Sequence, residues 1–446
     1  MSLIDPTLQS HWDRYLQASG RPATEVETAF QARFSGLRPG DDHIVFPPPP
    51  LHASFIDEMV AASRTILHCI DAIPERVFGG DVRAWLAFQG LADDEADFLQ
   101  QCCRGRQRAM ATSFARPDCV IADGTARMVE MNIAPPLGGT DTCDRIADEV
   151  HASDFGRFLA AAGVVLESPD TLGHWTRAIR ALTRLRADRP APVFFVALAD
   201  PDEQPSPRYP NYVRAIEAAG FVHRRGLIQH LQVRPDGVFH QGERVDVVFT
   251  MFTYAEFLRF QVPRPLALAL AQADEDGLVD YLLSPVNIAF DNKCNLELLT
   301  SPAFEAHWTP RERQVFARHI PATRRWRGAR LAQAAERRAG LVLKPARDFG
   351  GTGVTIGANV DDAAWRAALD TALAPGEHWV LQDVAAPMWR HEAASGAALN
   401  LCLGPLLYRG VHGGTFLRLR PALDDGVPVI NAAQGASVGL AMVRRG

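Results

Sequence analysis

The chain has 446 residues, of which 47% are hydrophobic and 22% are charged, and its formal net charge is −6. This length allows roughly three domains of ordinary size, and the apolar fraction is sufficient for a substantial buried core. The negative charge, with no evident basic face, argues against a general nucleic-acid binder. No run reaches the roughly 18 consecutive apolar residues typical of a membrane helix.

The start of the chain and its cysteines both indicate a cytoplasmic protein. The first fifteen residues contain no cationic segment followed by an apolar run, so we expect no secretory signal peptide. The seven cysteines are scattered, with no CxxC pair and no zinc-type spacing. Such a set suits a reducing compartment in which the thiols are small core residues.

Lysine is almost absent from this sequence. Only Lys293 and Lys344 occur among the 46 basic residues, and all the others are arginine. A compact ammonium on a flexible stem can contact a phosphate oxygen in a tight pocket that a guanidinium would crowd. The two lysines are therefore candidate phosphate ligands, although chance could also leave two lysines on the surface.

Residues 1–110 are predicted to be mostly helical. Apolar residues recur at helical spacing between 56 and 70, and Ser54 with Asp57 resembles a capping box at the start of that helix. A second helix is expected to begin near residues 93–95, where carboxylates suit a helix N-terminus. Neither helix suggests chemistry, so a scaffold role is expected.

A β-hairpin is predicted for residues 115–133, with its turn at Asp123-Gly124. Its oxygen donors are suited to a Mg²⁺ ion that bridges nucleotide phosphates, and an arginine beside them could hold a carboxylate or a transferring phosphoryl group. A solvated polar face is the alternative. The candidate residues are Arg116, Asp118, Glu130 and Asn132.

The register of this hairpin decides whether its two carboxylates can meet. A strict two-residue turn pairs Ala122 with Thr125 and places Asp118 and Glu130 on opposite faces. A three-residue loop with a bulge at Gly124 shifts the parity by one and brings all the polar side chains to one face. We therefore predict a bulged loop around Gly124.

The middle of the chain, residues 193–250, is predicted to be a small α/β unit. A buried strand, a helix ending at Gly220 and another strand follow in order, with a hairpin at Asp236-Gly237 between the last two. From residue 291 the pattern changes to helices and then to strands. Helices are predicted at 292–299, 310–319, 327–338 and after Asp361, and the C-terminal strands include residues 427–431.

A strand that delivers Lys344 leads into a loop containing Gly350, Gly351 and Gly353. Glycines let backbone N–H groups approach phosphate oxygens closely, and the lysine supplies a mobile positive charge. The loop is not a Walker A motif, because the lysine precedes the glycines and no helix follows immediately. A structural turn remains the alternative explanation.

The strand that ends at Gln382, Asp383 and Val384 is the third part of this pattern. A strand end can present backbone groups to an adenine edge, with a polar side chain for the amino group or the ribose. Alone, a solvated strand end explains it equally well. In series with Lys344 and the glycine loop, it favours a nucleotide site.

These motifs resemble the circularly permuted ATP-grasp ligases, in particular the synthetase domain of glutathionylspermidine synthase and related proteins. The matching set is R-x-D, E-x-N twelve residues after that Asp, an α/β unit, two separated lysines, and KP…GG.GV…Q-[DE]-V. It spans roughly residues 112–446. The resemblance implies an α/β (α+β) fold in which the metal-binding strands precede the nucleotide-binding part.

The resemblance also implies roles for the hairpin residues. Asp118, Glu130 and Asn132 would ligate Mg²⁺. Arg116 would contact the reacting carboxylate or its acyl phosphate.

For ATP, the resemblance implies that Lys293 and Lys344 hold the phosphates and that Gln382 contacts the adenine. Asp383 and the three loop glycines belong to the same ATP site. Arg418 or Asn431, in the final strands, is left open as a further contributor.

Two departures separate this chain from the glutathionylspermidine synthases. After Asn132 it has the sequence Ile133-Ala134-Pro135-Pro136, where those proteins carry polar residues that help hold the substrate. There is also no room for the amidase domain that some of them carry. Glutathione and spermidine are therefore not inherited as substrates.

We expect four parts: a helical region (1–110), a permuted ATP-grasp segment with the metal-binding hairpin (111–190), an α/β unit preceding the ATP-grasp part (191–290), and the nucleotide-binding part (291–446). The expected activity is ATP- and Mg²⁺-dependent ligation of a carboxylate to an amine through an acyl phosphate, with ADP released. A small-molecule phosphotransferase and a degenerate nucleotide-binding regulatory protein remain open. No nucleic-acid or membrane partner is expected, and the sequence names neither substrate nor oligomeric state.

Overall fold

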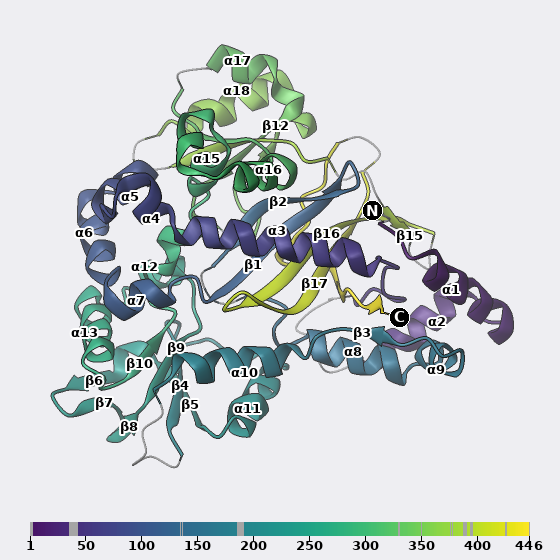
Figure 1. The fold of residues 1–446 in the computed structure, drawn as a ribbon, viewed down its shortest axis with the longest axis horizontal. Helices are drawn as coiled ribbons and strands as arrows, with labels where there is room; N and C mark the ends of the chain where they lie inside the picture. The colour runs from purple at the N-terminus through teal and green to yellow at the C-terminus, as the bar shows by residue number, and fades with distance from the viewer. Residues whose placement is uncertain are drawn as a thin grey trace.

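The structure is a computed structural model that describes residues 3–34, 43–133, 135, 137–184, 191–328, 331–348, 350–374, 376, 378–386, 390–392, 396–423 and 426–445. These residues form a mixed α/β fold with several sheets (Figure 1). Near the two ends of the chain, Arg444 Nε lies 3.0 Å from Asp5 Oδ2. The described residues contain no helix with the length and apolar character needed to cross a membrane. The division into four parts stays a prediction.

The central sheet joins the predicted hairpin to strands from the end of the chain. It is antiparallel, with the order β18-β17-β16-β1-β2 and with β15 paired to β16. Strands almost 300 residues apart in the sequence are therefore direct neighbours. Their bounds are β1 (Phe114–Ala122), β2 (Thr125–Asn132), β15 (Arg390–Glu392), β16 (Ala398–Tyr408), β17 (Val411–Pro421) and β18 (Ser437–Leu440).

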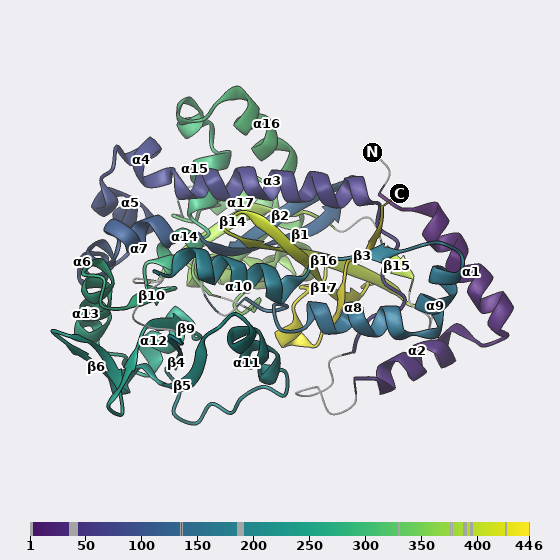
Figure 2. The same ribbon diagram turned by 60° about the horizontal axis from the view of Figure 1, so that its bottom comes forward.

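The long helix α3 (Ala53–Asp71) runs along this sheet and packs on β2 and β16 (Figures 1 and 2). Its buried residues share one apolar core with residues of β1 such as Ile121. The capping box predicted from Ser54 and Asp57 is wrong. Because the helix begins at Ala53, Ser54 already lies inside it, and the His52 side chain accepts the hydrogen bond from Ser54 N instead.

The remaining N-terminal helices lie at both ends of α3 in Figure 1. The helix predicted to begin near residues 93–95 is confirmed, since it starts at Asp93 with three acidic residues in its first turn. These helices are α1 (Pro6–Ser19), α2 (Ala23–Ala32), α4 (Ile73–Phe78), α5 (Val82–Gln89), α6 (Asp93–Cys102) and α7 (Gly105–Met110).

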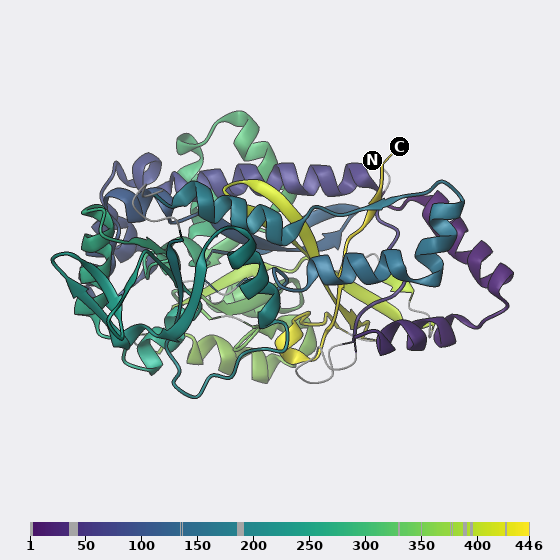
Figure 3. The ribbon, with the colours of Figure 1, turned by 90° about the horizontal axis from the view of Figure 1, so that it is seen from below.

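A second, parallel sheet has the order β10-β9-β4-β5, and a small antiparallel sheet of β6, β7 and β8 lies beside it (Figures 1 and 3). The predicted succession of strand, helix and strand is confirmed. The hairpin is also present, but its turn residues are Pro235 and Asp236 and not Asp236-Gly237, because Gly237 already pairs with Arg234. The strands are β4 (Val193–Leu198), β5 (Val222–Leu227), β6 (Leu231–Arg234), β7 (Gly237–His240), β8 (Glu243–Val245), β9 (Val247–Thr250) and β10 (Asp280–Leu282). The helices around them are α10 (Thr171–Leu182), α11 (Tyr209–Ala218), α12 (Tyr254–Arg259) and α13 (Arg264–Glu275).

Two short helices and a strand pair connect these sheets. Helix α8 contacts β17 and β18 of the central sheet, and β3 pairs with the last strand, β19. The elements are α8 (Cys143–Ala152), α9 (Asp154–Ala161), β3 (Leu166–Glu167) and β19 (Val443–Arg444).

A third sheet, β11-β14-β12-β13, is also antiparallel. It carries Lys344 and Gln382, and the helix predicted to be capped by Asp361 is confirmed, because that side chain accepts from Ala364 N. The strands are β11 (Thr323–Arg325), β12 (Leu341–Pro345), β13 (Thr355–Ile356) and β14 (Trp379–Asp383). The helices are α14 (Asn287–Asp291), α15 (Asn295–Thr300), α16 (Pro310–His319), α17 (Leu331–Glu336) and α18 (Asp362–Thr371).

The strand predicted at residues 427–431 is wrong. The segment is irregular, and side chains rather than a neighbouring strand bind its backbone. Asn359 Nδ2 donates to Val427 O at 2.7 Å, and Arg420 Nη1 donates to Val429 O at 2.8 Å. The backbone groups of an extended segment can form hydrogen bonds with side chains or with a neighbouring strand. Apolar alternation in the sequence does not distinguish these two cases.

Candidate active site

The hairpin of β1 and β2 is confirmed, but its bulge is not where we predicted it. Asp123 and Gly124 form a strict two-residue turn, with φ of 51° and 66°. Both values are positive, as in the type I′ turn that Asp-Gly favours. The loop therefore has no extra residue at Gly124, because the best local turn for this dipeptide is the tight one.

The parity change occurs inside the ladder instead. The register shifts between Asp118 and Cys119, so that Asp118 pairs with Glu130, Cys119 pairs with Met128, and Val129 is the additional residue. A single extra residue changes which face every later side chain occupies. Asp118 and Glu130 consequently lie on the same face as direct cross-strand neighbours.

Asp118 is held between two arginines. Arg418 Nη1 donates to Asp118 Oδ2 at 2.9 Å, and Arg116 Nε donates to Asp118 Oδ1 at 3.2 Å. Burial alone would raise the pKa of this carboxyl, but the two guanidinium groups hold it well below its usual range. Asp118 is therefore ionised at every ordinary pH. Arg418, left open in the sequence, is its principal partner.

Arg116 is fixed on several sides. Besides Asp118, its guanidinium donates through Nη1 to Gly138 O at 2.8 Å, and its stem lies over Gly404. A Cβ at Gly404 would come within 2.8 Å of Arg116 Cδ. The Asn132 amide nitrogen donates to Arg116 O at 2.9 Å, which turns the amide oxygen away from that carbonyl. The segment Ile133-Ala134-Pro135-Pro136 distinguishes the sequence from the glutathionylspermidine synthases. Two of its residues, Ala134 and Pro136, lie outside the described residues.

Lys293 reaches the hairpin from the segment between α14 and α15. Its ammonium lies 2.8 Å from Glu130 Oε1 and donates to Asp348 O at 2.7 Å. Burial lowers the pKa of a lysine, but the carboxylates of Glu130 and Asp291 more than offset it and raise the pKa of Lys293 above its ordinary value. This lysine is therefore a stable cation beside Glu130.

Lys344, on β12, reaches the same hairpin from the third sheet. Its ammonium donates to Gln382 Oε1 at 2.7 Å and to Val129 O at 3.3 Å. Burial lowers the pKa of Lys344 to about 8, with Glu130 opposing that effect and Lys293 adding to it. The bulged residue of the hairpin thus supplies a carbonyl to one of the two lysines.

Gln382 makes contacts that the sequence did not indicate. Its amide oxygen accepts from Lys344, and its amide nitrogen donates to Thr323 Oγ1 at 2.9 Å. The side chain is buried, so here it orients a lysine within the protein. A contact between Gln382 and a base stays a prediction. Asp383, next in the strand, is more exposed and lies 3.0 Å from Arg337.

The glycine-rich loop connects β12 and β13, as predicted, and Gly350, Gly351 and Gly353 all have positive φ. Gly351 also needs its small size, because a Cβ there would lie 2.8 Å from Val429 Cγ1. The loop therefore packs closely against the irregular segment 427–431.

These elements enclose a cavity of about 110 Å³ between the central sheet and the third sheet. Of the predicted residues, Asp118, Glu130, Lys344, Gly351, Gln382, Asp383 and Asn431 line it. Arg116, Asn132, Lys293, Gly350 and Gly353 do not line it, although Lys293 and Arg116 contact residues that do. Apolar walls that the sequence did not predict come from Val120, Val129, Val342, Ile356, Cys402 and Val429, among others. They carry no sequence signal, because apolar strand residues look the same in a core and in a pocket.

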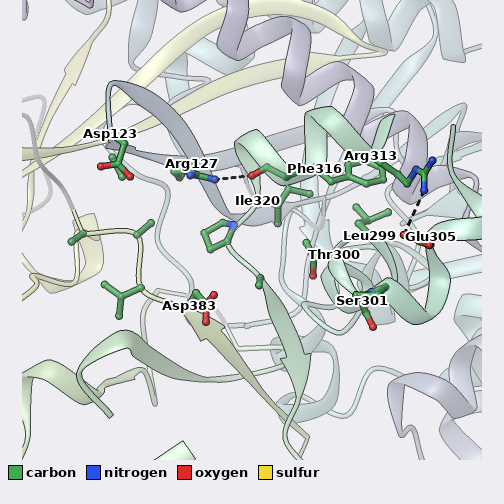
Figure 4. A pocket seen from close by; sticks show the side chains of 18 residues that line it. Asp123, Arg127, Leu299, Thr300, Ser301, Glu305, Arg313, Phe316, Ile320 and Asp383 are labelled. Carbon is green, nitrogen blue, oxygen red and sulfur yellow. Dashed lines mark hydrogen bonds and ion pairs between the residues drawn. The ribbon is translucent and has the colours of Figure 1, made fainter. Parts of the chain in front are cut away.

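A larger cavity, of about 590 Å³, borders the segment that follows β14 (Figure 4). It shares Asp383, Val384 and Ala385 with the smaller one, and Arg127, near the hairpin tip, donates to Ala317 O on its wall. Its hairpin wall includes Ala122, six residues along β1 from Arg116, which is about 20 Å at roughly 3.3 Å per residue. This cavity therefore flanks the strand-end side of the site, far from Arg116.

The donor set on the hairpin face fits a hard divalent cation. Two carboxylates, Asp118 and Glu130, are cross-strand neighbours, and the Asn132 amide oxygen is on the same face. Within the described ranges no group of three or more histidine, cysteine or acidic side chains could hold a metal, so a cation here would need the amide and non-protein oxygens as well. The neighbouring lysines and arginines suit an anion with several oxygen atoms.

Comparison with known proteins gives similarity in structure only. No family model and no curated protein matches the sequence. The structure is similar to that of a glutathione synthetase-like effector, GSS30, from Globodera pallida, with a TM-score of 0.55 and 14% identity over 91% of this chain and 95% of that one. A protein of Methylobacillus flagellatus KT, provisionally named a gamma-glutamylcysteine synthetase, has a TM-score of 0.41 and 10% identity over 84% of this chain and 86% of that one. The chain therefore shares the fold of a glutathione synthetase-like protein.

Proposed function

We propose that this protein is an ATP- and Mg²⁺-dependent ligase that joins a carboxylate to an amine and releases ADP and phosphate. We also propose that its fold is a circularly permuted ATP-grasp fold. One observation carries the proposal: Lys344, Asp118 and Glu130 line a single cavity, and Lys293 lies 2.8 Å from Glu130. The two lysines of the chain and the two hairpin carboxylates thus converge from three separate segments.

In this proposal the two lysines bind the phosphates, and the backbone after β14 lies beside the base. Asp118, Glu130 and Asn132 would hold Mg²⁺, which neutralises charge on the phosphate oxygens when bound. Arg116 orients the substrate carboxylate, because its side chain is already fixed by Asp118 and Gly138 O.

The chemistry follows from this placement. A carboxylate oxygen attacks the γ-phosphorus of ATP, the bond to the bridging oxygen breaks, and ADP leaves. The amine nitrogen then attacks the acyl carbon, and the C–O bond to phosphate breaks as the nitrogen loses a proton to the departing phosphate. The protein mainly positions the reactants and excludes water, since hydrolysis of an acyl phosphate would waste the ATP.

The test measures products from a panel of carboxylates, with hydroxylamine in place of the natural amine. An active carboxylate should give ADP and a hydroxamate in equal amounts, with an absolute requirement for Mg²⁺. Lys344→Ala should reduce turnover by a factor on the order of 100 or more while the protein stays folded. Release of AMP and pyrophosphate would contradict the acyl-phosphate mechanism, and ADP without any hydroxamate would identify a phosphotransferase.

A further inference from the structure

The charged groups of the site neutralise one another in the free protein. Lys293 Nζ lies 2.8 Å from Glu130 Oε1, with side chains that are 4% and 18% exposed. Arg418 Nη2 lies 2.5 Å from Asp118 Oδ1, and both side chains are more than nine-tenths buried. Each carboxylate that could bind a cation therefore already has a cationic partner from another segment of the chain.

The two partners differ in how they are held. Arg418 makes a two-pronged contact with Asp118, and its Nη2 also donates to Cys402 Sγ at 3.2 Å. Lys293 contributes a single ammonium on a flexible stem, so rotation about its side-chain bonds can move its charge. Of the two carboxylates, Glu130 is the one whose partner can leave without a change in the backbone.

The backbone at Lys293 is itself anchored. Its N–H donates to Ala346 O at 2.9 Å, just after β12, and its ammonium donates to Asp348 O in the glycine-rich loop. Two residues before it, Asp291 Oδ2 accepts from Ile133 N, directly after Asn132, at 2.8 Å. The lysine thus stands between the hairpin and the glycine loop, and an anion bound by that loop lies within its reach.

In the nucleotide-free protein, a free divalent cation gains little binding free energy at Glu130. It must displace an ammonium from a half-enclosed carboxylate, and the displaced charge would remain close to the metal in a poorly solvated site. A polyphosphate removes the obstacle, because its oxygens accept the ammonium while Glu130 turns to the metal. The exchange leaves every charge paired.

We propose that Lys293 is a switch that keeps Glu130 closed to metal until a nucleotide arrives, so that the site takes a metal–nucleotide complex and not the free ion. This rests on the proposed function, since the anion is the phosphate chain of ATP. The metal and the nucleotide then bind with strong positive coupling, and Lys293 moves from Glu130 to a phosphate oxygen.

The test uses Mn²⁺ as the probe and measures free Mn²⁺ by electron paramagnetic resonance, with and without a non-hydrolysable ATP analogue. The wild-type protein should bind Mn²⁺ at least roughly 30-fold more tightly when the analogue is present. Lys293→Met should bind Mn²⁺ without the analogue roughly tenfold more tightly than wild type. Lys293→Arg keeps the positive charge. In the absence of the analogue it should therefore bind Mn²⁺ as weakly as the wild type does.

Lys344→Met is the matched control, because it also removes one ammonium near the hairpin, but from a lysine that donates to Gln382 and Val129 O instead of Glu130. Its Mn²⁺ affinity without nucleotide should change less than roughly threefold. The double variant Lys293→Met/Glu130→Gln should lose the additional Mn²⁺ affinity of Lys293→Met. That loss would show that Glu130 binds the metal. Circular dichroism checks that each variant is folded.

Two outcomes would overturn the switch: tight Mn²⁺ binding by the wild type without the analogue, or equal Mn²⁺ affinities of Lys293→Met and Lys344→Met. If Lys293→Met does not fold, Lys293→Gln replaces it in the same comparison. Failure of the analogue to bind under any condition would instead contradict the proposed function. The Mn²⁺ affinities of the lysine variants alone still decide the switch in that case.

Discussion

Asp118 and Glu130 are direct partners across the β1–β2 hairpin, and they are so because Val129 is an additional residue in the ladder. If Val129 were paired in the ladder instead of bulged, the tight Asp123-Gly124 turn would put Val129 opposite Asp118 and place the two carboxylates on opposite faces. The same residue turns its carbonyl to Lys344 at 3.3 Å. One extra residue thus sets both the carboxylate pair and a lysine contact.

Deletion of Val129 should remove the bulge but leave Asp118 and Glu130 as cross-strand partners, so the Mn²⁺–nucleotide complex should still bind. The ladder would become regular, with Glu130 still opposite Asp118 and Asn132 still opposite Arg116. Val129→Ala is the control, since it keeps the residue count and should bind within roughly threefold of wild type. Equilibrium dialysis measures binding, and circular dichroism checks folding. A folded deletion variant that no longer binds the complex would show that the site needs the bulge itself, including the Val129 carbonyl that accepts from Lys344.

Lys344 should make the stability of the free protein depend on pH. Its pKa in the folded protein is about 8, below the ordinary value of 10.5. Between these values the unfolded chain carries the proton and the folded protein does not, so the free energy of unfolding should rise as the pH rises from 8 to 10.5. Below pH 8 both states are protonated and the contribution is flat.

Urea denaturation across this range measures the effect, with Lys344→Met as the variant that lacks the titrating group. The difference in unfolding free energy between wild type and Lys344→Met should change in favour of the wild type above pH 8. Gln382→Glu should weaken the dependence, because a carboxylate in contact with Lys344 would raise its pKa. A difference that stays constant from pH 7 to 10 would contradict the lowered pKa.

Gly404→Ala should impair Arg116 without disturbing the sheet. The added methyl would lie 2.8 Å from Arg116 Cδ, so the guanidinium must shift away from Asp118 and Gly138 O. We expect the KM for the carboxylate substrate to rise roughly tenfold, while the KM for ATP stays within about twofold.

Gly439→Ala is the matched control, because it is also a strand glycine of the central sheet but its nearest side chains lie 3.7 Å from the added Cβ. It should leave both KM values unchanged. In an Arg116→Ala background, Gly404→Ala should have no further effect on turnover. An additive loss in that double variant would show that Gly404 does not act through Arg116.

Arg418→Met should destabilise the protein by about 3–5 kcal/mol, because it leaves the Asp118 carboxylate buried without its principal partner. Arg418→Lys should recover only part of the lost free energy of unfolding, since an ammonium cannot make the two-pronged contact with Asp118. The surface pair of Arg83 and Asp93, 32% and 98% exposed, gives the comparison, and Arg83→Met should cost less than about 1 kcal/mol. Urea denaturation measures all three. Equal losses for Arg418→Met and Arg83→Met would contradict a structural role for the Asp118 pair.

The sequence by itself determined the local parts of this protein. The Asp123-Gly124 turn, the helix start at Asp93, the Asp361 cap and the glycine loop after β12 each depend on a few neighbouring residues, whose conformational preferences act at short range. The rarity of lysine also marked Lys293 and Lys344 in advance. The residue types of a charged site, and their order along the chain, were therefore evident from the sequence.

The tertiary structure decided which of these residues meet. Arg418 reaches Asp118 only because β17 joins the same sheet as β1, 300 residues away in sequence. Lys293 reaches Glu130 from the segment between α14 and α15. The bulge was misplaced for a different reason: the extra residue was expected in the turn, but Asp123-Gly124 forms the tight turn that this dipeptide favours, and the extra residue lies in the ladder at Val129. Long-range pairing of charges depends on chain topology, which short-range preferences do not encode.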